Sequence, residues 1–135
     1  MTKEINLQAQ TTLGGLLADG KIDQLHEVFA VNVLDHDPMP GQKPGVEGIK
    51  QFWTAFTTAF PDLTAEPTVV SADDEYVTVV LAITGTHHGD FQGHAATGKS
   101  ISVRGIQVGR FEDGKLVERW GASDELGILT QLGLV

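Results

Sequence analysis

The spacing of the apolar residues changes once along the chain, near Leu63, and this change limits the possible folds more than any other feature. Before it, apolar residues recur at the spacing of amphipathic helices, and after it they alternate as in strands. Helices are predicted over residues 3–18, 22–29 and 46–60, with an extended segment over 30–34. Strands are predicted over 63–71 and 75–88 and in two hairpin arms between 98 and 124, followed by a short helix over 126–132. This order predicts an α+β fold, with N-terminal helices packed on one face of a curved, mainly antiparallel sheet.

Length, composition and charge place the chain among globular proteins that fold without disulfides. Its 135 residues fit a single domain over 1–135, and 41% of them are hydrophobic. It has no cysteine, and no apolar run approaches the ~20 residues of a membrane span. The net charge of −9 argues against nucleic acid and anionic membranes as partners, because both require clustered Lys and Arg. We expect a cytoplasmic protein, since the first ten residues lack the apolar stretch of a secretory signal.

The turn of the C-terminal hairpin decides which side chains share a face of the sheet. Glu112-Asp113-Gly114 suits a three-residue loop with a bulge, in which the glycine takes the left-handed position. This register places on one face the pairs Gln107 with Arg119, Gly105 with Gly121, and Val103 with Ser123. A two-residue turn at Asp113-Gly114 would instead pair Gln107 with Trp120 and regroup the contacts. We favour the bulged turn.

Three glycines on that face leave a hollow, which we interpret as the floor of a cavity between helices and sheet. Glycines that let the strands bend, or let a helix approach closely, explain the pattern equally well. A mostly apolar cavity with few polar groups is typical of a site for a small hydrophobic ligand. The glycines are Gly105, Gly109 and Gly121, and the predicted wall adds Trp53, Val103, Gln107, Phe111, Val117 and Arg119.

Arg119 and Gln107 are the candidate groups for acting on a ligand. An arginine on a half-buried sheet face stays charged, and it can hold a carboxylate or stabilise an enolate-like oxygen. Gln107 can donate and accept hydrogen bonds, so it can orient a ligand without transferring protons. In the alternative interpretation, Arg119 only extends to solvent or pairs with Glu118 or Asp124 at the surface.

Two histidines are the candidate proton-transfer groups. His36 lies where the early extended segment meets a loop rich in Pro and Gly, at the expected mouth of the cavity. His87 continues the core-facing side of the strand that carries Val77. Histidine can act as acid or base near neutral pH, although a structural role is more frequent at a strand end. We expect no metal site, because the adjacent His87 and His88 point in opposite directions and the sequence positions no second ligand group.

The strands are apolar on both faces, although an antiparallel sheet with one face in water is expected to be more polar there. Ordinary strand propensity accounts for part of this pattern. We expect that a second copy covers the outer face and makes a homodimer. The outer face is predicted to carry Tyr76, Val80, Ala82, Ile106, Val108, Leu116 and Trp120.

Short motifs are spread over nearly the whole chain. They are Asp35-His36-Asp37-Pro38, Gly45-x-x-Gly48, Phe60-Pro61-Asp62-Leu63, Gly85-Thr86-His87-x-Gly89-x-Phe91-x-Gly93, Thr97-Gly98-Lys99, Arg110-Phe111-x-Asp113-Gly114-Lys115-Leu116, Glu118-x-Trp120, Asp124 and Gln131-Leu132-Gly133. Together they resemble the SnoaL-like polyketide cyclase family of the nuclear-transport-factor-2-like superfamily. The resemblance implies a cone-shaped α+β barrel that often dimerises, and ring closure by aldol condensation without a cofactor, with an aspartate as acid/base.

The same resemblance places different residues where the family has its acid/base pair. Aligned on Asp113-Gly114-Lys115, the family's aspartate falls on Gly121 and its nearby histidine on Gln107, while a substrate-contacting asparagine most nearly matches His36. Three interpretations remain open. The first is a cofactor-independent cyclase, isomerase or hydrolase acting on a small hydrophobic carbonyl compound, with His36 or His87 as base and Arg119 with Gln107 polarising an oxygen. The others are a binding module without chemistry and a dimeric interaction domain with a filled interior.

Overall fold

The computed structural model describes residues 2–135, and its helices and strands follow the predicted order. The helices are α1 (Thr2–Ala18), a 3-10 helix η1 (Ile22–Glu27), α2 (Gly45–Ala59) and α3 (Glu125–Gln131). The strands are β1 (Phe29–Asp35), β2 (Thr64–Ala72), β3 (Tyr76–Thr86), β4 (Ser100–Glu112) and β5 (Lys115–Ser123). These bounds confirm the predicted elements to within one or two residues. Within residues 2–135, no helix combines the length and the apolar character needed to cross a membrane.

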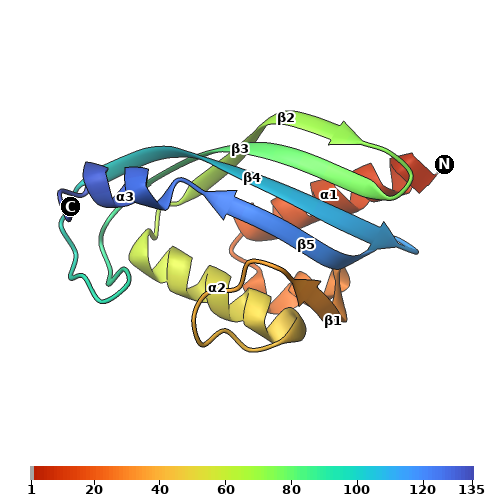
Figure 1. Ribbon diagram of the computed structural model, residues 1–135, viewed down its shortest axis with the longest axis horizontal. Coiled ribbons are helices and arrows are strands. Elements are labelled where there is room, and N and C mark those ends of the chain that lie inside the picture. The colour runs from red at the N-terminus through yellow and green to blue at the C-terminus, as the bar shows by residue number, and fades with distance from the viewer. Residues whose placement is uncertain (1) are drawn as a thin grey trace.

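The five strands form one curved sheet in the order β1-β5-β4-β3-β2. β1 runs parallel to β5, and the other neighbouring strands are antiparallel. Figure 1 shows the sheet arching over α1 and α2, with α3 just beyond the end of β5. The predicted α+β fold is therefore confirmed. The sheet stays open, because β1 and β2 form its two edges.

The core lies between the helices and the concave face of the sheet, in two clusters. One joins Leu13 of α1 and Ile49 of α2 to Val79 of β3, all nearly inaccessible to solvent. The other is built around the end of α2 and the inner side of α3. Trp53 and Leu81 pack against both clusters, so they mark the place where the two meet. Apolar burial on this scale is the main stabilising term of the fold.

The turn of the β4–β5 hairpin is shorter than predicted. Glu112 pairs with Lys115, so the loop consists of Asp113 and Gly114 alone. Both loop residues have positive φ angles, 50° and 76°, as a type I′ turn requires. The predicted three-residue loop is wrong because Asp113 also takes the left-handed conformation that we had assigned to the glycine alone.

A bulge at Val117 follows the turn. On the turn side Phe111 pairs with Leu116, and beyond the bulge Arg110 pairs with Glu118. The bulge leaves Leu116 fully buried in the core, so its predicted place on the outer face is wrong. The physical reason is that one extra residue reverses the alternation of side chains on one arm of the hairpin only.

Beyond the bulge, the pairs differ from the predicted ones by two positions, and the alternative pair of Gln107 with Trp120 does not form. A shift of two residues keeps every side chain on its predicted face, because side chains alternate with a period of two. Gln107, Arg119 and the glycines therefore lie on the predicted face of the sheet, although the predicted register was incorrect. The observed pairs are Gln107 with Gly121, Gly109 with Arg119 and Gly105 with Ser123, in place of Gln107 with Arg119, Gly105 with Gly121 and Val103 with Ser123.

Candidate functional site

A cavity of about 850 Å³ lies between α2, the loop after β1 and the concave face of the sheet. Its apolar wall includes Phe52, Trp53 and Phe56 of α2, with Leu81 of β3 opposite. An adjoining lobe of about 440 Å³ shares Phe52 and Phe56 and extends toward Phe91. Two adjoining lobes with mostly apolar walls suit an elongated small molecule.

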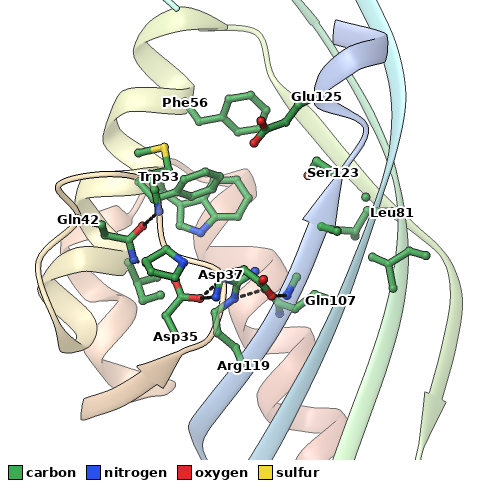
Figure 2. A pocket seen from close by; sticks show the side chains of 18 of the residues that line it. Asp35, Asp37, Gln42, Trp53, Phe56, Leu81, Gln107, Arg119, Ser123 and Glu125 are labelled. Atoms are coloured by element: carbon green, nitrogen blue, oxygen red, sulfur yellow. Dashed lines mark hydrogen bonds and ion pairs between the residues drawn. The ribbon is translucent and has the colours of Figure 1, made fainter. Parts of the chain in front are cut away.

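Polar side chains gather at one end of the cavity. Figure 2 shows Asp35, Asp37, Gln107 and Arg119 together there, with Phe56 toward the other end. The parallel pairing of β1 with β5 places Asp35 beside Arg119, and Nη1 of Arg119 donates to Oδ1 of Asp35 at 2.6 Å. Nε of Arg119 donates to Oε1 of Gln107 at 3.4 Å. These contacts fix the plane of the guanidinium group relative to the sheet.

The ion pair between Asp35 and Arg119 is largely removed from water. The Arg119 side chain is 17% exposed and the Asp35 side chain 10%. Asp35 is held from three directions, since Oδ1 also accepts from the backbone N–H of Asp37 at 2.9 Å and Oδ2 accepts from Nε2 of Gln42 at 2.9 Å. The backbone N–H of Met39 in turn donates to Oε1 of Gln42 at 3.1 Å. The loop after β1 is thereby tied to the same point of the sheet as the guanidinium group.

Gly121 leaves the space that Arg119 occupies. A Cβ atom at position 121 would collide with Nη2 of Arg119, so the guanidinium group lies directly over this glycine. Nη2 itself has no hydrogen-bond partner among residues 2–135. A fixed cationic N–H group without a protein partner, inside a cavity, is an arrangement that stabilises negative charge developing on a ligand oxygen.

The structure brings together only part of the predicted site. Phe111 is buried in the core at 3% exposure, Val103 packs against the second core cluster, and Val117 occupies the bulge. These three positions do not line the cavity, because Phe111 and Val103 keep their predicted face but are taken up by core packing and Val117 lies in the bulge. The predicted residues that do line the cavity are Trp53, Gly105, Gln107, Arg119 and Gly121.

His36 lies on the outer face of the sheet and not at the mouth of the cavity. Its backbone N–H donates to the carbonyl of Arg119 at 3.0 Å, which extends the β1–β5 ladder by one residue and turns its side chain away from that of Asp35. The ring stacks on Trp120 at 4.6 Å, and Nε2 lies 2.6 Å from Oε2 of Glu118. Hydrogen bonds from His36 and then Arg110 hold the pKa of the Glu118 carboxyl below its usual value.

His87 faces the core as predicted, and it is fully buried. Its Nδ1 accepts from the backbone N–H of Thr97 at 3.1 Å, so this nitrogen carries no proton in the observed arrangement. The ring is covered by Phe60 and Phe91, with centroids at 5.6 and 6.4 Å. Nε2 has no partner among the residues that the structure describes. The cavity wall includes neither His87 nor His36.

The acidic residues that line the two lobes of the cavity were not among the predicted site residues, and they are Asp35, Asp37, Asp90 and Glu125. Strand alternation was the available signal for Asp35, which ends β1 on the side opposite to His36, whereas Asp37 lies in the loop beyond the strand. Nothing in the sequence pointed to Glu125, which begins α3. In the described part of the chain, His, Asp and Glu side chains form no group of three or more that is arranged to hold a metal ion.

Comparisons with known proteins agree with this architecture. A family model described as SnoaL-like polyketide cyclase matches residues 7–132. Aklanonic acid methyl ester cyclase DauD of Streptomyces sp. (strain C5) is 31% identical over 110 residues, which cover 81% of this chain and 66%, just under two thirds, of that protein. The solved structure of TsrD from Streptomyces laurentii has a TM-score of 0.88 at 20% identity and covers 98% of this chain and 97% of its own. The solved structure of IdmH from Streptomyces antibioticus has a TM-score of 0.82 at 27% identity, and the match covers 95% of this chain and 98% of IdmH.

Proposed function

Because the chain belongs to the SnoaL-like polyketide cyclase family, we propose that it is a cofactor-free enzyme that closes a ring in an elongated, hydrophobic carbonyl compound by aldol-type addition. The size and apolar wall of the two-lobed cavity support a substrate with aromatic or fused-ring parts. The similarity to DauD, named for ring closure of aklanonic acid methyl ester, supports the reaction class.

The unpaired Nη2 of Arg119 is the observation that carries this proposal. Aldol addition passes through an enolate, whose oxygen bears negative charge that the ground-state carbonyl lacks. The Arg119 group, held by Asp35 and Gln107, faces the cavity without having to reorganise when that charge develops. In this proposal Trp53 and the neighbouring aromatic side chains hold the apolar body of the substrate.

The proposal is tested by incubating the protein with aklanonic acid methyl ester and separating the ring-closed isomer by chromatography. Arg119→Ala is expected to lower turnover about 100-fold or more, the usual effect of losing one oxyanion donor. Arg119→Lys keeps a cation for Asp35 but removes the planar guanidinium group with its several N–H donors, so this variant is also expected to lose most of the activity. Arg104→Ala, at an exposed position on the outer side of β4, is the matched control and should leave turnover unchanged.

A ligand-binding module without chemistry is the second candidate. It is favoured by Gly121 and Gln107, which the family resemblance aligns with the acid/base pair of characterised cyclases. Tryptophan fluorescence separates the two candidates, because Trp53 lines the cavity whereas the other tryptophan, Trp120, stacks on His36 on the outer face. Quenching by aklanonic acid methyl ester without any turnover would support the binding module and contradict the enzyme. Turnover that is unchanged in Arg119→Ala would contradict the role proposed for the arginine.

We also propose that the protein forms a homodimer through the outer face of the sheet. Cross-strand pairs align one apolar side chain from each of four strands into a continuous row. The row consists of Val69, Val80, Ile106 and Ala122, and Ile106 is 46% exposed in the single chain. Burying such a row against its own copy in a two-fold interface would remove it from water.

A further inference from the structure

The loop after β1 brings a second carboxylate, that of Asp37, to the polar end of the cavity. Its Oδ2 accepts a hydrogen bond from the backbone N–H of Gly121 at 2.8 Å. Oδ1 has no hydrogen-bond partner among residues 2–135. Asp37 and Arg119 therefore contact the same glycine: the Asp37 carboxylate accepts from its N–H, and the guanidinium group of Arg119 lies where its side chain would be.

The chain holds Asp37 in this place by three local features. Its own N–H donates to Oδ1 of Asp35 at 2.9 Å, which fixes the first turn of the loop. Pro38 follows, and a residue before proline is restricted to extended conformations. Finally, β1 diverges from β5 after the bond from His36 to Arg119, so the next N–H of β5 is taken by the Asp37 carboxylate.

Other titratable groups near the cavity are less suited to accept a proton from a ligand. Both oxygens of Asp35 are engaged, by Arg119 and by Gln42. His36 lies on the outer face, and His87 is sealed behind Phe60 and Phe91. Glu125 lines the cavity wall at the start of α3, toward the other end of the cavity in Figure 2, and Asp90 lines the adjoining lobe. Asp37 is the one among these groups whose carboxylate is bound at Gly121, the residue over which the guanidinium group of Arg119 lies.

We infer that Asp37 is the proton acceptor and donor of the proposed reaction, an assignment that rests on the proposed function. Its carboxylate removes a proton from the carbon next to a substrate carbonyl. The C–H electron pair becomes the enolate π bond, and the carbonyl oxygen takes the negative charge beside Nη2 of Arg119. The enolate carbon then bonds to a second carbonyl carbon of the same molecule, and the resulting alkoxide takes the proton back from Asp37. The step consumes no oxidant or reductant, and because Asp37 is exposed, its carboxyl can equilibrate with water between turnovers.

The first half of this sequence can be measured alone, as exchange of the α-hydrogens of β-tetralone for deuterium in D₂O. Asp37→Asn retains an oxygen that accepts from the Gly121 N–H but no longer accepts a proton, so it is expected to lower the exchange rate about 100-fold or more. Quenching of Trp53 by β-tetralone should stay within about twofold of the wild-type value, because binding does not depend on the base. In Asp37→Ala, added formate should restore part of the exchange by supplying a carboxylate.

Asp113→Asn is the matched control, since this aspartate lies in the distant β4–β5 turn, where asparagine tolerates the positive φ angle. Exchange in Asp37→Asn at the wild-type rate, together with loss of exchange in Arg119→Ala, would overturn the role of Asp37 and leave the proposed function standing. A wild-type protein that fails to bind β-tetralone, or binds it without exchange, would contradict both. Loss of exchange in Asp37→Asn with binding retained, and recovery of Asp37→Ala by formate, would establish the assignment.

Discussion

At the scale of single residues, the side chains of the site fill one another's space and balance one another's charge. Gly121 lacks a side chain, and the space above it is filled by the guanidinium group of Arg119, which Asp35 neutralises. Removing Asp35 would leave a cation only 17% exposed without its partner, so the pair is expected to tolerate substitution poorly. The sequence identified Arg119, Gln107 and Gly121 because alternation alone assigns them to one face. It did not identify Asp37, because the proline-rich loop has no periodicity from which a direction can be read.

Glu118 provides a residue-scale prediction about pH. Hydrogen bonds from His36 and Arg110 lower the pKa of its carboxyl in the folded protein, so the folded state is stabilised relative to the unfolded state when the group is ionised. This stabilisation is fully present above the ordinary glutamate pKa and is lost as pH falls through the lowered value. Thermal unfolding followed from about pH 6 to pH 3 should therefore show a shallower acid-side decline in Glu118→Gln than in the wild type. Glu66→Gln, at an exposed position on β2, serves as control, and equal slopes in all three proteins would refute the prediction.

At the scale of secondary-structure elements, the hairpin shows what sequence patterns can and cannot fix. Alternation predicted β3, β4 and β5 and the side chains on each face, because burial of one face enforces a period of two. The register was missed because Asp113 adopts a positive φ angle and Val117 bulges, and neither depends on a hydrophobic pattern. The predicted register was wrong by two positions, which left the site residues on their predicted face. The bulge at Val117 was not predicted, so Leu116 and Val117 were assigned to the wrong positions.

The loop between β1 and α2 is the element that most affects the site. It was predicted only as an irregular connection, since prolines and glycines exclude regular structure without specifying a path. Gln42 and the backbone N–H of Asp37 tie this loop to Asp35, and thus to Arg119 on β5. The position of Asp37 therefore depends on contacts between segments that lie far apart in the sequence, which local patterns do not encode.

At the scale of the whole molecule, the curved sheet has two faces that differ in what they carry. The concave face carries the cavity, and the convex face carries the apolar row that includes Ile106 and the stack of His36 on Trp120. Figure 1 shows α1 and α2 beneath only one side of the sheet, which leaves the other side without helices. The apolar character of both faces was predicted from the strands, and the proposed homodimer would account for the outer one.

The proposed homodimer is tested by measuring the molar mass in solution by light scattering during gel filtration. The wild type is expected to have the mass of two chains, and Ile106→Glu that of one, because a charge in the middle of the row would be buried without a partner. Ile5→Glu introduces the same charge at a 55% exposed position on α1, away from the row, and should leave the dimer intact. A monomeric wild type, or a dimeric Ile106→Glu, would exclude this interface.

The roles of Arg119 and Asp37 are tested most directly by a crystal structure of the protein with β-tetralone bound. We expect the ketone oxygen within about 3 Å of Nη2 of Arg119, the usual distance of such a hydrogen bond, and the α-carbon facing the Asp37 carboxylate. The aromatic ring should contact Trp53 and Phe56. A ligand whose oxygen points away from Arg119, or a cavity that stays empty at saturating ligand, would contradict the claim that this end of the cavity performs the chemistry.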